Sequence, residues 1–257
     1  TLNATSTHDT KRSEDVRARI SVLSEIPDEW EARLVRWQGW NRAKKRETGR
    51  LPVPEANTEV LLYQTMIGAW PLSREEVPDF RERLKAYMIK AVREAKSFTS
   101  WLRVNREYED ALLHFIDAIS EESADNRFLP DFLQFQAKVA YYGALNSISQ
   151  VVLKVTSPGV PDFYQGTELW DFSLVDPDNR RPVDFVRRRE LLESLIPKNV
   201  NGEPASIANM LGSWPDGRVK VYVIYQAQNA RRDYPALFQK GDYIPVSIEG
   251  EKHEHVC

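Results

Sequence analysis

Apolar residues recur at helical spacing along most of the chain before residue 158. Val16, Ile20 and Leu23 lie three or four positions apart, which is the period of one helix face. The same period recurs in segments 58–70, 80–95, 108–119 and 131–156. The pattern predicts a helical block over residues 16–130 without a convincing strand, followed by a long helix that starts at Asp131.

Three other segments have the composition of strands. Residues 2–7 and 162–165 are short, apolar and bounded by turn-forming residues, and residues from 241 onward alternate around a turn at Gly250. Residues 219–226, VKVYVIYQ, also alternate like a strand, but they continue directly into a segment with helical character. The pattern alone leaves the structure of that last segment open.

The stretch SPGVPDFYQGTELWDFSLVDPDNRRPVD, residues 157–184, concentrates turn-forming and charged residues. Its prolines favour a turn followed by an extended segment, because proline restricts its own backbone and that of its predecessor. The predicted strand ends at Gly166, and carboxylates, amides and arginines follow. Parallel barrels carry functional groups at the carboxyl ends of their strands, so the stretch is a candidate site. An ordinary polar loop with internal salt bridges explains the same spacing equally well.

Composition and charge exclude several classes of function. The 257 residues include 35 basic and 38 acidic side chains, so no general field favours nucleic acid or an anionic membrane. No apolar run approaches the roughly 20 residues that a membrane span needs. The single cysteine, Cys257, excludes an internal disulfide framework and fits a reducing, cytoplasmic location. We therefore predict neither a nucleic-acid partner nor a membrane partner.

Sequence motifs point to no cofactor and no metal. The chain has no phosphate-binding loop, no glycine-rich dinucleotide fingerprint and no HExxH or paired-cysteine zinc pattern. His253 and His255 would share one face of a predicted strand, but no third ligand accompanies them. We predict no metal site and no cofactor.

Three segments together resemble the maltooligosyltrehalose synthases of the α-amylase family of glycoside hydrolases and transglycosylases. The segments are ATSTHDTKRSEDVRARI at 4–20, LLYQTMIGAWP at 61–71 and TSPGVPDFYQGTELWDFSLVDPDNRRPVDF at 156–185. The resemblance runs with gaps over most of the chain, and the third segment is long enough to be specific.

The resemblance implies a mainly α fragment of a (β/α)₈ barrel enzyme, from the carboxyl-terminal end of the barrel. Residues 1–15 would end barrel strand 7 and form a catalytic loop, and residues 16–130 would be a large helical insertion. Residues 131–240 would supply the returning helix, strand 8 and the last barrel helix, with 219–226 helical. Residues 241–257 would begin a truncated C-terminal β domain, and both chain ends would be cuts in a longer polypeptide.

The implied reaction is a retaining intramolecular transglycosylation of maltooligosaccharides. The α-1,4 linkage at the reducing end becomes an α,α-1,1 linkage, which gives a trehalose end. Such a mechanism needs a nucleophilic carboxylate and a carboxylic acid, and the resemblance places both upstream of residue 1, so the chain alone is expected to be inactive. It assigns Asp9 as a third carboxylate that stabilises the transition state, with His8 beside it on the sugar.

Further side chains are expected to hold the substrate. Lys11 and Arg12 would hold the reducing-end glucose while it rotates and attacks again, and ordinary surface charge at a helix start is the alternative. The resemblance places a second set at the mouth of the same site: Tyr164, Gln165, Glu168, Asp176, Asn179, Arg180 and Arg181. For residues 176–181 an internal ion-pair network explains the pattern as well as sugar contact does. Trp170 is expected to pack in the core.

Two other functions stay open at this point. A plain α-amylase-type hydrolase or glucanotransferase would share the late-barrel pattern, although the strings DPDNRRPVDF and LLYQTMIGAWP argue against it. In the second alternative the helical block is a non-catalytic interaction module. It would bind a partner such as maltooligosyltrehalose trehalohydrolase, the hydrolase that releases trehalose.

Overall fold

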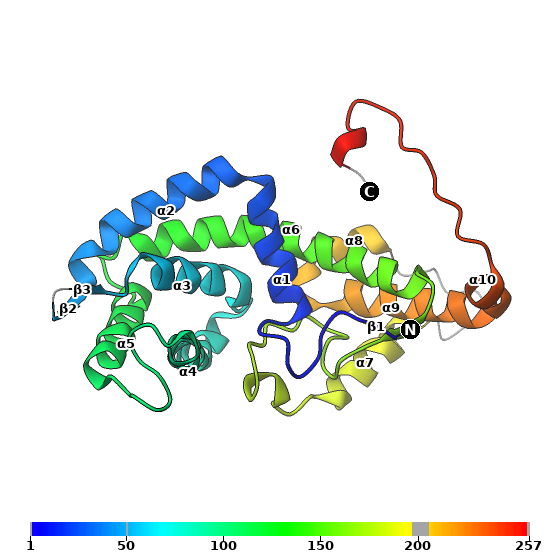
Figure 1. Cartoon of the computed structure of the whole chain (residues 1–257). Helices are drawn as coiled ribbons and strands as arrows, with labels where there is room; N and C mark the ends of the chain where they lie inside the picture. Colours follow the sequence, from blue (N-terminus) through cyan, green and yellow to red (C-terminus); the bar gives the residue numbers. More distant parts are fainter. Residues whose placement is uncertain (1, 50, 197–205, 256–257) are drawn as a thin grey trace.

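The computed structural model describes residues 2–49, 51–196 and 206–255 and is mainly helical (Figure 1). Its α-helices and strands in chain order are β1 (Leu2–Ala4), α1 (Glu14–Ser21), α2 (Pro27–Asn41), β2 (Arg46–Thr48), β3 (Leu51–Val53), α3 (Ala56–Ala69), α4 (Val77–Ala95), α5 (Arg106–Ser120), α6 (Phe128–Thr156), β4 (Val160–Asp162), α7 (Phe185–Leu195), α8 (Ile207–Gly212), α9 (Arg218–Asp233) and α10 (Pro235–Lys240). Short 3₁₀ turns complete it: η1 (Val22–Glu25), η2 (Arg42–Lys44), η3 (Arg74–Glu76), η4 (Asp178–Arg180), η5 (Trp214–Asp216) and η6 (His253–His255).

The larger core lies between α2, α3 and the first half of α6, with α4 and α5 completing it. Trp37 is at its centre, and the rings of Tyr63, Phe128, Phe132 and Phe135 lie with their centroids 5.3–5.8 Å from it. Aromatic pairs at such separations stabilise a core beyond the burial of their area. The helices predicted for residues 16–130 are therefore present, and they share one core with α6.

A small hairpin interrupts this helical block and corrects the expectation that it holds no strand. β2 and β3 pair antiparallel, with Arg46 opposite Val53. Strands of three residues are too short to show a period of two, so the sequence pattern could not reveal them. Lys45, just before β2, forms a 2.7 Å ion pair with the buried carboxylate of Glu59, which fixes the base of the hairpin to α3.

β1 and β4, far apart in the sequence, form a two-stranded parallel sheet with Ala4 opposite Asp162. Both strands were predicted, but with wrong bounds: residues 5–7 and 163–165 lie beyond the sheet, and β4 begins at Val160. The aromatic side chains of Phe163 and Tyr164 favour a strand, yet the pairing of β4 with β1 ends at Asp162, opposite Ala4. The side chains of Leu2 and Val160 are largely exposed.

The helices α1 and α6 cross in close contact at Gly143. A Cβ added to this glycine would lie 2.7 Å from Arg19 Cα, a separation that real Cβ atoms do not tolerate. Arg19 cannot move aside easily, because its guanidinium is buried and donates a 2.7 Å hydrogen bond to the carbonyl oxygen of Trp70. The crossing holds α1, and the loop before it, against the long helix.

Gly143→Ala is expected to destabilise the chain by about 1–3 kcal/mol, because the methyl group overpacks the α1–α6 crossing. Gly39→Ala in α2 is the matched control, since a Cβ there meets nothing within 4 Å; it should stabilise by roughly 0.5–1 kcal/mol through helix propensity. Urea unfolding of both variants measures the two effects. Equal shifts of the two midpoints in the same direction would contradict the close crossing.

A second, smaller core joins α7, α8 and α9 and includes Leu169, Met210 and Val219. The ambiguous segment 219–226 lies within α9, as the resemblance implied. Its local strand-like alternation is overridden because Val219, Lys220 and Val221 are all buried in the contact of this helix with α6 and α7.

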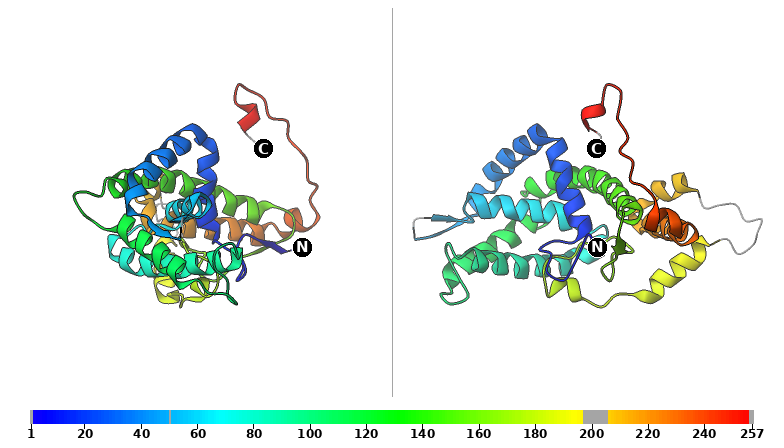
Figure 2. Two further views of the ribbon diagram at one scale, coloured as in Figure 1. Left: turned by 60° about the vertical axis from the view of Figure 1, so that its left-hand side comes forward. Right: turned by 45° about the vertical axis from the view of Figure 1, so that its right-hand side comes forward.

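Residues 241–255 do not form the strands that their alternation predicted. The described part of this segment contains no strand, and its predicted strand around His253 is instead the 3₁₀ turn η6. The segment extends away from the body in each view (Figure 2). Tyr243, Ile244 and Val246 are 76–83% exposed. An alternating sequence becomes a strand only where a neighbouring strand pairs with it, and residues 241–255 have no such neighbour in the described structure.

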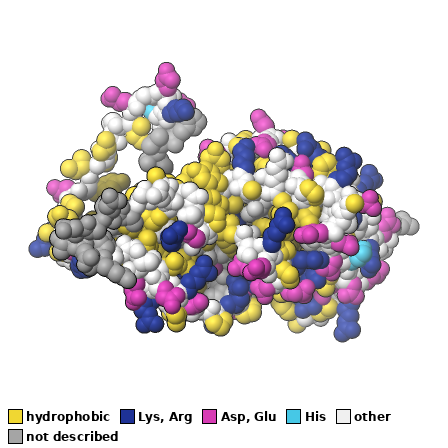
Figure 3. Space-filling model, turned by 180° about the vertical axis from the view of Figure 1, so that it is seen from behind, with side chains coloured by type: hydrophobic (Ala, Val, Ile, Leu, Met, Phe, Trp, Pro, Cys, Tyr) yellow, Lys and Arg dark blue, Asp and Glu magenta, His cyan; other side chains and the backbone are white. Residues whose placement is uncertain are grey.

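Several large apolar side chains reach the surface. Tyr141, Tyr142, Val152 and Leu153 of α6 are each at least 40% exposed. Apolar surface is also visible between the charged groups on the face seen from behind (Figure 3). Contiguous apolar surface is typical of a face that packs against other protein.

Candidate active site

The parallel pairing of β1 and β4 brings two polar segments to one edge of the structure. The chain leaves both strands in the same direction, so residues 5–13 and residues 163–184 begin side by side. Asn179 joins the two segments, because its Nδ2 donates a 2.8 Å hydrogen bond to the carbonyl oxygen of His8. Among the described residues no group pairs with the buried Oδ1 of Asn179. The arrangement is a polar surface built from both segments.

His8 and Asp9 lie at the tip of a turn in the first segment. Thr10 closes the turn, and its Oγ1 donates a 2.7 Å hydrogen bond to the carbonyl oxygen of Thr7. The carboxylate of Asp9 lies 3.1 Å from His8 Nε2 and is 83% exposed. A carboxylate held in this way can accept hydrogen bonds from the hydroxyl groups of a ligand.

Lys11 and Arg12, the predicted holders of the reducing-end glucose, face the helical block. Lys11 Nζ lies 3.1 Å from a carboxylate oxygen of Glu94 in α4. Arg12 Nη2 donates a 2.9 Å hydrogen bond to Thr65 Oγ1 in α3. Arg12 also forms a β-bridge with Leu174 in the second segment. Both side chains therefore link the turn to its surroundings in the described structure.

Tyr164, Gln165 and Glu168 follow β4 around Gly166. Gly166 has φ +92°, a conformation that favours glycine, and this lets the chain turn four residues after the end of β4. The hydroxyl of Tyr164 lies 3.4 Å from the carbonyl oxygen of Asn179. Glu168 forms a 2.9 Å ion pair with Arg188 in α7. Its carboxylate therefore links the segment after β4 to α7.

Residues 176–181 form the ion-pair network that the sequence offered as one of two explanations. Arg180 pairs with Asp176, and Arg181 Nε lies 3.1 Å from a carboxylate oxygen of Asp178. Asp178 also forms an ion pair with Arg83 of α4, with 2.9 Å between Oδ2 and Nη1, and both side chains of this pair are nearly buried. The network connects the segment to the helical block.

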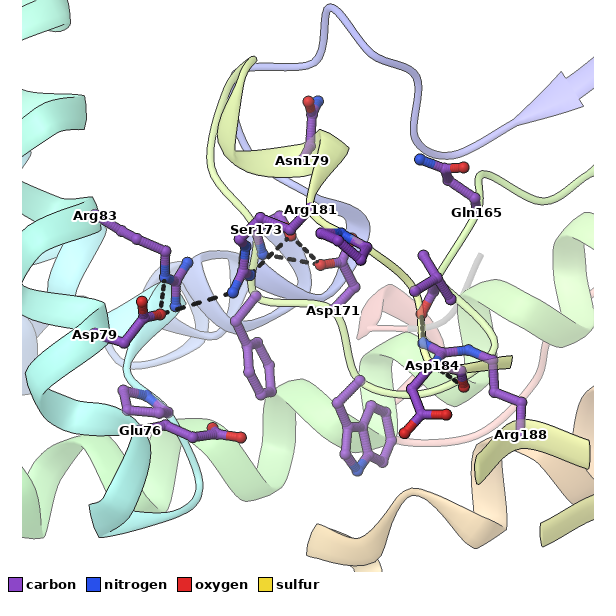
Figure 4. Close-up of a pocket in the computed structure, with 16 residues that line it drawn as sticks. Glu76, Asp79, Arg83, Gln165, Asp171, Ser173, Asn179, Arg181, Asp184 and Arg188 are labelled. Atoms are coloured by element: carbon purple, nitrogen blue, oxygen red, sulfur yellow. Dashed lines mark hydrogen bonds and ion pairs between the residues drawn. The ribbon is translucent and has the colours of Figure 1, made fainter. Parts of the chain in front are cut away.

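A pocket of about 310 Å³ lies between η3, α4 and residues 165–188. Figure 4 shows Asp79 and Arg83 on the side of α4, facing Arg181, Ser173 and Asp171. Gln165 and Asn179 lie on the side of the pocket toward the turn of His8 (Figure 4). Trp170 and Phe172 also line the pocket and supply an apolar wall. Polar groups around a partly aromatic cavity are typical of sites for small polar ligands such as sugars.

Asp171 is a pocket residue to which sequence reasoning gave no role. Burial raises the pKa of its carboxyl, and the nearby carboxylate of Asp15 adds to that rise, against hydrogen bonds from Ser173. Ser173 donates its backbone N–H to the carboxylate at 3.0 Å. No local pattern distinguishes Asp171 from its acidic neighbours, because its environment is made by segments distant in the sequence.

Trp170 packs in the core, as expected. Its ring meets that of Trp214 edge to face with 5.9 Å between centroids. Its Nε1 donates a 2.8 Å hydrogen bond to the carbonyl oxygen of Trp214. These contacts hold the apolar wall of the pocket against η5.

A buried cluster of charges lies beneath the two segments and was not predicted. Lys220 of α9 is fully buried, and its Nζ lies 2.9 Å from a carboxylate oxygen of Glu14 and 2.9 Å from one of Asp15. Lys154 of α6 lies 3.6 Å from Glu14. Glu14 and Asp15 lie in the first turn of α1, where acidic residues are common because they favour the helix dipole, so their pattern does not single them out. The signal that could have revealed the cluster is a lysine inside each of two apolar runs, VVLKVT and VKVYV.

The charges of Glu14 and Lys220 stabilise each other. Burial opposes ionisation of Glu14, but the attraction of Lys220 and Lys154 outweighs it and lowers the pKa of Glu14. Burial likewise opposes the charge of Lys220, yet Asp15 and Glu14 raise the pKa of this lysine above its ordinary value. For Lys154, burial prevails and lowers its pKa.

Neither a metal centre nor a membrane span is found in the described part of the chain. No three His, Cys, Asp or Glu side chains in residues 2–49, 51–196 and 206–255 lie close enough together to hold a metal ion. Among the helices of these ranges, none has the long apolar stretch that crossing a bilayer requires.

Comparison with known proteins gives one consistent result. The chain is 37% identical over 255 residues to a curated Mycobacterium tuberculosis protein described as a maltooligosyl trehalose synthase, and the match covers 99% of this chain and 29% of the relative. A crystal structure of a maltooligosyl trehalose synthase superposes with a TM-score of 0.82 at 41% identity, over 97% of this chain and 32% of the other. The maltooligosyltrehalose synthase of Arthrobacter ramosus gives a TM-score of 0.76 at 36% identity, over 99% and 30%. No protein-family model matches the chain. The chain thus spans less than a third of the length of these relatives.

Proposed function

Because this chain is homologous to one segment of the maltooligosyl trehalose synthases, we propose that it is part of an enzyme that isomerises maltooligosaccharides. The α-1,4 linkage at the reducing end is converted to an α,α-1,1 linkage by retaining intramolecular transglycosylation. The observation that carries this proposal is the exposed carboxylate of Asp9, held on a turn beside a second polar segment and a pocket suited to sugars.

In this proposal Asp9 accepts hydrogen bonds from two hydroxyl groups of the glucose ring that reacts. Positive charge develops on that ring in an oxocarbenium-like transition state, and hydrogen bonds that strengthen there lower the barrier. His8, 3.1 Å away, orients the carboxylate and contacts the same ring. Tyr164, Gln165 and Asn179 line the approach to it from the second segment.

Two further carboxyl groups complete the proposed mechanism. A retaining glycosidase-type reaction needs a nucleophile and an acid whose carboxyl groups are about 5–5.5 Å apart. Since this chain spans 29–32% of the relatives' length, we propose that both groups come from a part of the protein before residue 1. The chain alone is then inactive.

The proposed architecture is the end of a (β/α)₈ barrel. Residues 1–15 and 131–240 supply its last two strands and their helices, residues 16–130 are an insertion, and residues 241–257 enter a C-terminal domain. The parallel pairing of β1 and β4 supports this assignment, because parallel sheets occur almost only with further strands and helices around them. The exposed apolar side chains of Leu2, Val160 and Leu153 are then covered by the remaining barrel.

Transglycosylation in place of hydrolysis requires that the cleaved glucose stays in the site. Lys11 and Arg12 are proposed to hold it, and the helical block fixes both side chains through Glu94 and Thr65. Arg181 and residues 176–180 shape the wall of the pocket through their ion pairs. The trehalose-terminated product has the chemistry required by maltooligosyltrehalose trehalohydrolase, which we propose as the functional partner.

The test is an incubation of the full-length protein that carries this chain with maltopentaose. We expect reducing ends to disappear without the formation of shorter sugars, because the isomerisation releases nothing. Reducing-end titration and chromatography of the products measure this directly. New reducing ends would show a hydrolase, shuffled chain lengths would show a glucanotransferase, and an unchanged substrate would contradict an enzymatic role on maltooligosaccharides.

A further inference from the structure

Two buried lysines connect the two polar segments of the candidate site beneath its surface. Lys154 reaches from α6 to the ends of both parallel strands. Its Nζ donates a 2.8 Å hydrogen bond to Thr5 Oγ1, directly after β1. The same Nζ lies 3.8 Å from the ring centroid of Phe163, directly after β4. One cation thereby contacts the first residue beyond each strand.

Lys220 makes a second connection, between the residues that follow the first segment and Leu169 in the second segment. Its ammonium group contacts Glu14 and Asp15, where the turn of Asp9 enters α1. It also lies 3.4 Å from the carbonyl oxygen of Leu169 in the second segment. Asp15 strengthens this connection, because it accepts a 2.7 Å hydrogen bond from the backbone N–H of Asp171.

The cluster holds both ends of the loop that carries His8 and Asp9. At the start of the loop, Thr5 Oγ1 donates a hydrogen bond to the carboxylate of Glu14. Ser6 Oγ accepts a 2.8 Å hydrogen bond from the backbone N–H of Glu14. Residues 5 and 6 are thereby fixed to residue 14, and the intervening residues form a closed loop whose exposed tip bears Asp9.

We propose that Lys154 and Lys220 are positioning residues that hold the Asp9 loop and the segment after β4 in one fixed arrangement. This inference rests on the proposed function, in which Asp9 acts on the reacting sugar. Neither lysine touches substrate, since both are buried. Their effect passes through Thr5, Glu14 and Asp15 to the carboxylate of Asp9. A displacement of about 1 Å at a reacting centre is enough to lower a rate by two orders of magnitude.

Two hydroxyl groups that donate to different carboxylates of the cluster allow a positioning role to be distinguished from a general effect on stability. Thr5 Oγ1 joins Lys154 to Glu14 and lies at the start of the loop. Ser147 Oγ, on α6, donates to the carboxylate of Asp15 and contacts no residue of the loop through this hydrogen bond. Removing either hydroxyl deletes one hydrogen bond to a buried carboxylate of the same cluster, and removing that of Thr5 also deletes the hydrogen bond that it accepts from Lys154. Thr5→Val removes a connection to the loop, whereas Ser147→Ala leaves the loop attached.

The experiment compares Thr5→Val with Ser147→Ala in two measurements. Hydrogen exchange of the chain without substrate reports the order of the loop, and we expect the amides of residues 7–10 to exchange at least tenfold faster in Thr5→Val only. Isomerisation by the full-length protein should show kcat lowered about tenfold or more in Thr5→Val with little change in KM, because Asp9 acts in the transition state. Thr5→Ser, which restores the hydroxyl, should recover both values.

The outcomes distinguish the inference from the function on which it rests. Equal exchange rates in Thr5→Val and Ser147→Ala would overturn the positioning role, whatever the activity. The same holds if the two variants lose kcat to the same extent, since that pattern indicates a general loss of stability. If the wild-type protein does not isomerise maltooligosaccharides, the proposed function fails, and the exchange experiment alone decides whether the cluster orders the loop.

Discussion

Asp9→Asn is expected to lower kcat by about 10²–10⁴-fold in the full-length protein, with the melting temperature unchanged. Hydrogen bonds that strengthen in a glycosidic transition state contribute several kcal/mol, and each 1.4 kcal/mol is tenfold in rate. An amide has one oxygen in place of two and carries no charge, so it stabilises the developing oxocarbenium ion poorly. The folded chain loses little, because the Asp9 carboxylate is 83% exposed and its neighbour is the half-exposed His8.

Initial rates of reducing-end loss, together with thermal unfolding, measure this prediction. Asp233→Asn is the control, because Asp233 is also an exposed carboxylate paired with a neighbour on the surface, but at the far end of α9. It should retain full activity. An Asp9→Asn variant that is as active as Asp233→Asn would remove Asp9 from the chemistry.

Lys220→Met is expected to destabilise the chain by about 3–5 kcal/mol, which is the usual cost of removing one partner from a buried ion pair. The variant leaves the carboxylates of Glu14 and Asp15 buried and deprives them of their closest cation. Total stabilities of about 5–15 kcal/mol are typical, so the loss is a large fraction of the whole.

Urea unfolding at neutral pH measures the loss. Lys138→Met provides the control, because Lys138 pairs with Glu29 at 2.6 Å on the exposed surface of α6. Exposed pairs contribute about 0–1 kcal/mol, so this variant should be nearly as stable as the wild type. Similar midpoints for Lys220→Met and Lys138→Met would contradict a buried charge cluster.

The difference in the free energy of unfolding between the wild type and Lys220→Met should decrease as the pH falls toward 4. In the wild type the pKa of Glu14 is below its ordinary value, since the attraction of the two lysines outweighs its burial. The unfolded state therefore binds more protons, and the contribution of Glu14 is present above pH 4.5 and lost as the pH falls through the lowered pKa. Without Lys220, burial raises the pKa of Glu14. Protonation of Glu14 then removes the cost of burying its charged carboxylate in the variant. Urea midpoints of the wild type and of Lys220→Met at several pH values between 4 and 7 measure whether their stabilities converge. A constant difference between the two would contradict the prediction.

The helical part of the fold could be predicted from the sequence because its information is local. The apolar period around Val16, Phe80 and Phe132 fixes which face of each helix is buried, and the structure contains these helices with those residues in its core. Similarly, Pro158 and Gly166 mark turns through their own backbone restrictions. The family resemblance rests on the same kind of local information, in strings of 11 to 30 residues.

Strand bounds and the carboxyl-terminal segment could not be predicted in this way. A strand exists only through its partner, and the pairing of Ala4 with Asp162 joins positions that are 158 residues apart. Alternation in residues 241–255 indicated β structure, but the described chain offers those residues no strand to pair with. Conversely, residues 219–226 alternate like a strand and yet are helical, because burial against α6 and α7 outweighs local preference.

The same distinction between local sequence information and tertiary packing applies to the candidate site. The sequence indicated the elements of the candidate site, which are the His8–Asp9 pair and the polar run after Gly166, together with a resemblance to one family of enzymes. Which of these groups meet follows from the tertiary structure. It showed that Lys11 turns to Glu94, that residues 176–181 pair among themselves and with Arg83, and that Lys154 and Lys220 hold the two segments together from below. The physical reason is that a charge acts on what lies within a few ångströms of it, and that distance is set by the packing of whole helices.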